Sequence, residues 1–238
     1  MAAGSYQYEG NELILFQQAH KWKKYFAAQL IPCISGRVLE VGAGLGATTQ
    51  LLYNGKASDW LLLEPDASMC EVLQTKIKDG NLPALCRVQT GTIDLLDEKF
   101  DTIIYIDVLE HIRKDREELF KAASLLNPGG HLLVLSPAFP HLYSPFDKAI
   151  GHYRRYTRRS LGQLAPASLR LIRCRYYDSF GYLAALANKV FLRQQYPGIR
   201  QVLFWDRWLI PLSRIIDQLL FHLFGKSILA VWKKGATD

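Results

Sequence analysis

The chain has 238 residues, of which 49% are hydrophobic and 21% charged. A chain of this length and composition can bury a core of its own, so it needs neither disulfides nor a metal ion to fold. Its four cysteines are scattered without a CxxC pair. That spacing favours free thiols in a reducing compartment over a zinc site or a disulfide framework.

The formal charge of +7 at pH 7 raises the question of an acidic partner. Arginines cluster at 154–159 and 170–175, but no recognised nucleic-acid-binding motif accompanies them, so we do not expect nucleic acid as a partner. The clusters fit a solvated basic face as well as an anion-binding site. The N-terminus lacks a basic segment followed by an apolar one, and charges interrupt the most apolar stretch, 202–224. We therefore expect neither a signal peptide nor a spanning helix, and a cytoplasmic location.

Helical and extended segments alternate over the first 135 residues. The pattern predicts helices at 13–30, 48–53, 67–78 and 116–126, and strands at 37–41, 60–63, 85–89, 100–106 and 131–135. Asn127-Pro128-Gly129-Gly130 is a strong turn signal after the last of these helices. Strands separated by helices indicate βαβ units and a mostly parallel sheet.

The pattern changes beyond Pro137. A loop with three prolines leads into the basic segment, followed by a strand at 169–177, a helical and aromatic insertion at 181–224 and a last strand at 227–232. We expect a single domain with a helical cap (1–35), an α/β core (36–178), a helical insertion (179–225) and a last strand with its tail (226–238).

The insertion carries an apolar stripe at helical spacing: Trp208, Leu212, Ile215, Ile216, Leu219, Leu220 and Leu223. The simplest interpretation is that this stripe packs the insertion onto the sheet domain. Two alternatives stay open: a lid over an apolar substrate, or a helix that lies on a membrane surface as a peripheral contact.

A glycine-rich turn follows the first strand, in the sequence Glu40-Val41-Gly42-Ala43-Gly44-Leu45-Gly46. Glycine permits a tight turn and the close approach of the backbone to a ligand. The GxGxG spacing differs from the dinucleotide-type GxGxxG. The acidic Glu40 suits the cationic amino acid end of a sulfonium cofactor better than a pyrophosphate. Glu64 ends the next strand, where a carboxylate can accept both hydroxyls of a ribose.

Two further motifs complete a resemblance. Asp107-Val108-Leu109-Glu110-His111 follows the fourth strand, and Leu126-Asn127-Pro128-Gly129-Gly130 precedes the fifth. With the glycine turn and Glu64, these motifs resemble, in the same order, those of the class I S-adenosylmethionine-dependent methyltransferases. The resemblance covers residues 37–136. It implies an α/β, Rossmann-like fold with a seven-stranded, mostly parallel sheet, helices on both faces and a helical lid or insertion before the last strand.

The resemblance also implies a cofactor site for S-adenosylmethionine. Gly42 and Gly44 would approach the amino acid portion near Glu40, Glu64 would hold the ribose, and Asp107 and Val108 would flank the methionyl portion. Asp66 and Ala67 would border the adenine. The family's usual acidic turn after the third strand is replaced by Thr92 and Ile93, which we expect in the adenine pocket.

The segment Gly151-His152-Tyr153-Arg154-Arg155-Tyr156 resembles a GHYRRY element of a bacterial branch of this superfamily. Tyr153, Arg154 and Arg155 are candidates to bind the substrate, because guanidinium groups pair with carboxylates and phosphates. A structural role, with the arginines paired to acids of the protein, is the alternative.

A general base is needed only if the acceptor is protonated and weakly nucleophilic. His152 and His111 are the candidates, although His111 fits a helix-capping or pocket-shaping role equally well. No cluster of His, Cys, Asp or Glu has metal-ligand spacing along the sequence, so we expect no metal requirement.

The sequence favours an enzyme that methylates a small molecule, with an anionic or lipid-like acceptor as one class. Three alternatives remain: a methyltransferase for RNA or protein, a non-catalytic cofactor-binding scaffold, and a nicotinamide-dependent reductase. The glycine spacing and Glu40 oppose the reductase, and the intact motifs oppose the scaffold.

Overall fold

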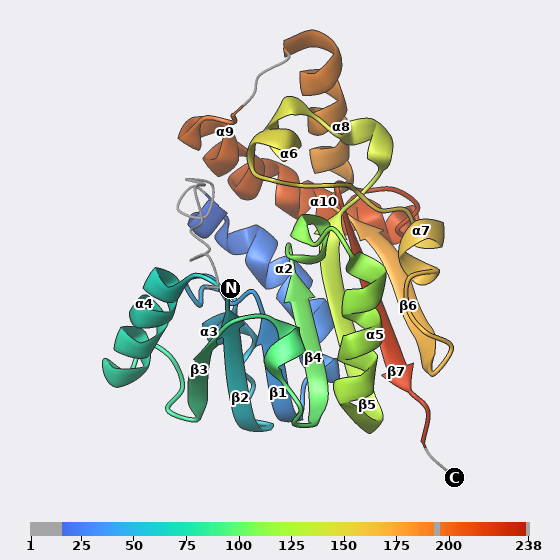
Figure 1. The fold of residues 1–238 in the computed structure, drawn as a ribbon. Helices are drawn as coiled ribbons and strands as arrows, with labels where there is room; N and C mark the ends of the chain where they lie inside the picture. The colour runs from blue at the N-terminus through green and yellow to red at the C-terminus, as the bar shows by residue number, and fades with distance from the viewer. Residues whose placement is uncertain (1–15, 193–195, 237–238) are drawn as a thin grey trace.

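One mixed sheet forms the centre of the molecule (Figure 1), described here by a computed structural model of residues 16–192 and 196–236. Its strands lie in the order β3-β2-β1-β4-β5-β7-β6, and only β7 runs antiparallel to its neighbours. The predicted α/β fold with a seven-stranded, mostly parallel sheet is therefore confirmed. The strands are β1 (Gly36–Val41), β2 (Ala57–Glu64), β3 (Cys86–Thr90), β4 (Phe100–Ile106), β5 (Leu126–Pro137), β6 (Leu169–Tyr177) and β7 (Ser227–Lys234).

Apolar cores cover both faces of the sheet, as parallel strands require. Phe26 and Leu30 belong to the core on one face, and Leu119 and Ala122 to the core on the other. The helices are α2 (His20–Leu30), α3 (Thr49–Leu52), α4 (Ala67–Lys78), α5 (Asp115–Leu125), α6 (Pro145–Ala149), α7 (Arg158–Gly162), α8 (Ser179–Ala187), α9 (Ile199–Phe204) and α10 (Ile210–Leu219). A π-helical segment, Trp205–Leu209, joins α9 to α10. None of the helices in the described ranges is long and apolar enough to cross a membrane.

The predicted turn at 127–130 is part of β5, which begins at Leu126 directly after α5. Leu126 already pairs with Phe100 of β4, and the register shifts before Thr102. Gly129 absorbs the irregularity with a φ of 79°. Helix α5 thus ends where the motif predicts, but the chain continues directly into β5 with no loop between them.

The interpretation that the apolar stripe packs onto the sheet domain is wrong. Trp208 is 56% exposed, Ile215 60% and Leu219 65%, so the stripe faces outward. The buried side of the same helix carries Asp206 and Asp217, which are 7% and 1% exposed. The helix is amphipathic as predicted, but its packed side is mixed, because Asp206 and Asp217 lie there beside the core residues Val202, Trp205 and Ile210.

Buried carboxylates explain why the apolar stripe faces outward. Asp206 accepts hydrogen bonds from the backbone N–H groups of Lys21 (3.0 Å) and Trp22 (2.8 Å), in the first turn of α2. The first-turn N–H groups of a helix have no partner within the helix. The insertion therefore supplies the acceptors that α2 lacks.

Asp217 does the same for α8. It accepts from the backbone N–H groups of Asp178 (2.8 Å) and Ser179 (3.0 Å), and from the Tyr25 hydroxyl (2.9 Å). One carboxylate thereby joins α2, α8 and α10. Turning the helix over would bury the stripe but leave these donors unsatisfied, at about 1–3 kcal/mol for each group.

We expect Asp217→Ala to lower the free energy of unfolding by about 2–4 kcal/mol, because it leaves buried donors without an acceptor. Urea denaturation followed by circular dichroism measures the loss. Asp97→Ala is the control, because Asp97 is exposed, and its effect should stay within about 0.5 kcal/mol. Equal stabilities of the two variants would contradict the role of Asp217.

Candidate functional site

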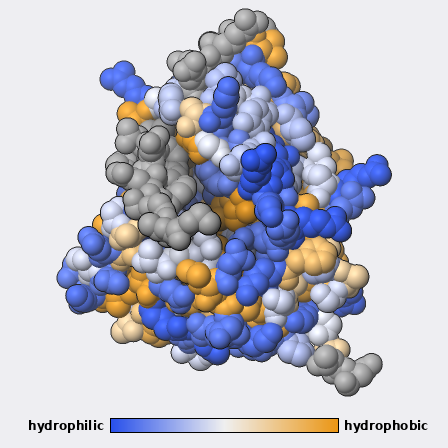
Figure 2. All heavy atoms as spheres, in the orientation of Figure 1, coloured by the Kyte–Doolittle hydropathy of each residue, from blue (hydrophilic) through white to orange (hydrophobic). Residues whose placement is uncertain are grey.

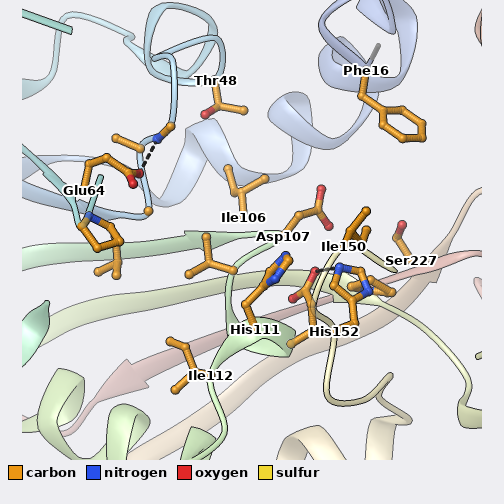
Figure 3. Close-up of a pocket in the computed structure, with 18 of the residues that line it drawn as sticks. Phe16, Thr48, Glu64, Ile106, Asp107, His111, Ile112, Ile150, His152 and Ser227 are labelled. Carbon is orange, nitrogen blue, oxygen red and sulfur yellow. Dashed lines mark hydrogen bonds and ion pairs between the residues drawn. The ribbon is translucent and has the colours of Figure 1, made fainter. Parts of the chain in front are cut away.

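A cavity of about 770 Å³ opens at the carboxyl ends of the parallel strands (Figure 3). Strands β1, β2 and β4 reach it through Val41, Glu64 and Ile106, and the helical insertion contributes Trp205. Hydrophobic surface is visible near the centre of the molecule's face, between the helical layer and the sheet (Figure 2). In open α/β folds this edge of the sheet is where ligands bind.

The glycine turn forms one wall of the cavity. Gly42 and Gly44 have φ values of 67° and 55°, in the left-handed region that glycine tolerates. A Cβ atom on Gly42 would lie 2.5 Å from Cγ2 of Val108, so a side chain there would collide with the wall. The N–H groups of Gly42 and Ala43 donate to the Leu63 carbonyl, which fastens the turn to β2.

Glu64 stands at the end of β2 and faces this turn (Figure 3). Its Oε2 accepts from the Gly44 N–H (2.8 Å) and its Oε1 from the Asp66 N–H (3.0 Å). Each oxygen can accept a further hydrogen bond, so the carboxylate can still bind hydroxyl groups. Burial raises the pKa of Glu64, and the two N–H donors oppose that shift.

Three residues expected at the cofactor lie behind the wall and are absent from the cavity lining. Glu40 accepts from the hydroxyls of Thr48 (2.7 Å) and Thr49 (2.9 Å) and from the Trp60 indole (3.0 Å). Asp66 caps α4, and Ala67 is the first residue of that helix. Their contribution to the cavity is therefore indirect: they hold the elements that line it.

The other expected cofactor residues, Thr92, Ile93, Asp107 and Val108, do line the cavity. Asp107 has a φ of 53°, so the chain bends sharply after β4 and turns this carboxylate toward the cavity. Desolvation by the surrounding protein raises the pKa of Asp107 to about 6, although the residue is exposed and His152, Lys226 and Arg155 all lower the pKa. A carboxylate surrounded by three cationic or ionisable side chains marks the centre of the site.

The side chains of residues 152–155 point in different directions, two toward the cavity and two away from it. His152 and Arg155 are each 9% exposed and line the cavity. Tyr153 is 55% exposed, and Arg154 pairs with Asp115 (2.8 Å) and donates to the Arg113 carbonyl (2.8 Å). Neither lines the cavity, so the structure does not bring these two candidate substrate residues to it. The Tyr153 N–H donates to the Glu110 carbonyl, which holds the backbone of this segment against the loop after β4.

Asp147, which sequence reasoning missed, holds the two inward residues. Its Oδ1 accepts from His152 Nδ1 (2.9 Å) and Arg155 Nε (2.9 Å), and its Oδ2 accepts from Arg155 Nη2 (3.0 Å). Because a carboxylate only accepts, Nδ1 of His152 is the ring nitrogen that donates to Asp147, and Nε2 lies on the other side of the ring. The helix-start pattern from Ser144 to Asp147 was the available signal, since both form a capping box on α6.

His111 and His152 lie against one another in the cavity, with ring centroids 4.5 Å apart (Figure 3). Burial, and then the neighbouring His152, lower the pKa of His111 to about 4, so this ring is neutral at pH 7. Glu110 completes a group in which one donor atom from each residue lies within 4.8 Å of the others. Spacing along the chain did not indicate this group, because it forms only when the fold brings His152 next to Glu110 and His111.

Glu110 is fully buried, and neither of its carboxylate oxygens has a hydrogen-bond partner among the described residues. Its Oε1 lies 3.7 Å from Nε2 of His152. Zinc ligands lie about 2.0–2.2 Å from the ion, so these donors would have to approach one another to share one. The expectation that the protein needs no metal ion stays a prediction.

Lys226 is a second residue that sequence reasoning missed. Its ammonium lies 4.4 Å from the Trp205 ring centroid and 5.5 Å from that of Phe16, and all three residues line the cavity. Burial lowers the pKa of Lys226, and Asp178 opposes that shift most. Within residues 16–192 and 196–236, no carboxylate forms an ion pair with it. A lysine preceding an apolar strand carries no sequence signal for such a position.

Comparison with known proteins relates this chain to a known protein family. Residues 39–132 match the model of a family described as a methyltransferase domain. A demethylmenaquinone methyltransferase of Tropheryma whipplei (strain Twist) is 30% identical over 162 residues, which cover 66% of this chain and 64% of that protein. A ubiquinone biosynthesis O-methyltransferase of Bradyrhizobium sp. (strain ORS 278) is 27% identical over 110 residues, 45% of this chain and 42% of that protein. The chain thus matches less than two thirds of the length of these relatives.

Among solved structures, a geranyl diphosphate methyltransferase in complex with SAM superposes with a TM-score of 0.64. The match covers 95% of this chain and 91% of that one, at 12% sequence identity. At this identity the likeness concerns the fold alone.

Asp147→Asn should lower the free energy of unfolding at pH 7 by about 2–4 kcal/mol, because it leaves the buried Arg155 charge uncompensated. Burial alone would raise the pKa of Asp147, but the hydrogen bonds from His152, Arg155 and Ser144 and the Arg155 charge hold it well below its usual range. The stabilisation is therefore fully present above the unfolded-state pKa, about 3.9, and is lost as pH falls toward the lower folded-state value.

Urea denaturation of wild type and Asp147→Asn from pH 7 down to pH 3 measures this dependence. The difference between the two proteins should shrink below about pH 4, since asparagine does not titrate. A difference that is constant over this range, or absent at pH 7, would contradict the ion-pair network.

Proposed function

We propose that this chain, whose residues 39–132 match a methyltransferase domain family, is a class I S-adenosylmethionine-dependent methyltransferase that methylates a small, largely apolar molecule bearing an anionic or readily ionised group. The observation that carries the proposal is the shared cavity. It joins the glycine turn and Glu64 to the Asp147–His152 pair and to the unpaired ammonium of Lys226. One half fits the methyl donor, and the other half fits an acceptor.

The cofactor half fits S-adenosylmethionine, the methyl donor of this domain family. Gly42 and Gly44 leave room against Val108 that a Cβ atom would fill, so the backbone can approach a ligand closely. Glu64 would hold the ribose hydroxyls, and Thr92 and Ile93 would border the adenine. When bound, the cofactor supplies an electrophilic methyl group on a positively charged sulfur.

The acceptor half is largely apolar and contains the ammonium group of Lys226. Phe16, Phe146 and Trp205 line it with Ile150, and Lys226 lies over two of these rings. Arg155, proposed from the sequence as an anion clamp, has its charge matched by Asp147. Lys226 is therefore the cation that an acceptor's anionic group would meet.

His152 is the residue we assign as general base. Asp147 fixes its Nδ1–H and leaves Nε2 as the acceptor of a proton, with the carboxylate stabilising the imidazolium that forms. His111 shapes the pocket against the His152 ring. Alignment of acceptor and donor in a closed site can supply about 7–11 kcal/mol of rate enhancement, and a base adds about 10²–10⁴-fold.

The relatives support a small-molecule acceptor. One is named for demethylmenaquinone and another for a step of ubiquinone biosynthesis. These acceptors belong to those proteins. For this chain the two names favour a small-molecule acceptor, and RNA is the competing acceptor, because another relative is named a tRNA U34 carboxymethyltransferase.

Cofactor binding should depend on Glu64. We expect S-adenosylhomocysteine to bind with a micromolar dissociation constant, and Glu64→Gln to weaken it about 10-fold or more, since a hydrogen bond to a charged group is worth about 1.5–3 kcal/mol. Isothermal titration calorimetry measures both. Glu71→Gln, an exposed acid on α4, is the matched control and should leave the affinity unchanged. Absence of binding to the folded wild type would sink the proposed function.

Transfer of radiolabelled methyl from S-adenosylmethionine tests the acceptor class. We expect label in an organic-soluble extract of bacterial lipids and none in total RNA or protein. His152→Gln should reduce transfer about 10²–10⁴-fold while leaving S-adenosylhomocysteine affinity intact. Lys226→Met should raise the KM for the acceptor, and Lys226→Arg should restore it in part. Label in RNA or protein would overturn the small-molecule assignment.

A further inference from the structure

An exposed apolar surface runs along the outside of the helical insertion. We call it the outer helical face, and its members are each 45–82% exposed: Ile199, Leu203, Phe204, Trp208, Leu212, Ile215, Leu219, Phe221 and Leu223. They belong to α9, the π-helical segment, α10 and the turn that follows, which form one layer over the carboxyl ends of the strands (Figure 1). A contiguous apolar surface of this kind marks an interaction site in a folded protein.

The outer helical face cannot turn inward to bury itself. Asp206 and Asp217 occupy the opposite side of the same helix and accept hydrogen bonds from α2 and from the start of α8. Ser213, also fully buried, donates to Asp178 at 2.8 Å. The exposure of the outer helical face is therefore fixed by the packing of the inner side of the same helix.

The exposed arginines and the buried acids of residues 199–224 leave this part of the surface with positive charge only. Arg200, Arg207 and Arg214 are exposed and recur at seven-residue spacing, which places them along one line of the helix. The two acids of residues 199–224, Asp206 and Asp217, are buried. Arg207 lies over the Trp208 ring, 5.3 Å from its centroid.

We propose that the outer helical face binds the surface of a membrane that contains anionic lipids. Apolar residues on one side, a row of arginines beside them and a tryptophan at the boundary are the composition of an interfacial helix. Each basic residue near an anionic membrane surface contributes about 1 kcal/mol. A second copy of this chain fits less well, because its own row of arginines would repel the first.

The placement also connects the surface to the cavity. Trp205 lines the cavity from the inner side of the helix, while Phe204 and Trp208 face outward. Membrane binding would therefore hold the acceptor half of the cavity next to the bilayer. The inference itself rests on the outer helical face and stands whether or not the proposed acceptor is correct.

Co-sedimentation with vesicles tests the proposal on the full chain. We expect binding to vesicles of phosphatidylcholine with about 30% phosphatidylglycerol, at least tenfold weaker binding to phosphatidylcholine alone, and weakening by salt. The triple variant Phe204→Ser, Trp208→Ser and Ile215→Ser should lose about tenfold or more in affinity. A second triple variant replaces the arginines: Arg200→Gln, Arg207→Gln and Arg214→Gln. It should bind anionic vesicles only as weakly as wild type binds phosphatidylcholine alone.

Phe120→Ser with Ile172→Ser is the control, because these are exposed apolar residues of α5 and β6, outside the outer helical face. It should bind vesicles like wild type. Circular dichroism and S-adenosylhomocysteine titration establish that each variant is folded. No binding to anionic vesicles, or equal loss in the control, overturns the proposal. So does a stable dimer in sedimentation velocity that the serine variant abolishes.

Discussion

The arrangement of this molecule depends on three buried carboxylates that link the helical insertion to the rest of the chain. Asp206 satisfies the start of α2, and Asp217 and Asp178 satisfy the start of α8. Buried polar groups left without partners are costly, so the chain is stabilised when these acceptors face inward. The apolar stripe of α10 then has to face outward, against its ordinary tendency to be buried.

The same carboxylates shape the cavity. Asp178 accepts from the Trp205 indole at 2.8 Å, which holds that ring at the acceptor end. The Asp178 carbonyl accepts from the Lys226 N–H at 2.9 Å and so positions the start of β7. On the other side Asp147 fixes His152 and neutralises Arg155. The pairing of Arg155 with Asp147 leaves Lys226 as a charge at the acceptor end that a ligand can meet.

The sequence predicted the sheet and the cofactor wall well, because both depend on local patterns. Strands such as β4 are continuous apolar runs that have to be buried on both faces, and Gly42 and Glu64 lie at fixed positions after such runs. The orientation of the α10 stripe could not be predicted, because periodicity identifies an apolar face without saying which side is packed. The Glu110–His111–His152 group and the role of Asp147 depend on contacts between separate loops. Of the four residues of this segment, His152 and Arg155 face the cavity and Tyr153 and Arg154 do not. The sequence motif does not specify these directions.

Amide hydrogen exchange by NMR tests the central claim, that carboxylates of the insertion satisfy the helix starts of α2 and α8. The relevant N–H groups belong to Lys21, Trp22, Asp178 and Ser179. First-turn N–H groups lack intrahelical acceptors and ordinarily exchange quickly. The account predicts that these four are protected to the same degree as the amides of β4. Exchange at the rate of an unstructured peptide would show that Asp206 and Asp217 do not satisfy these N–H groups.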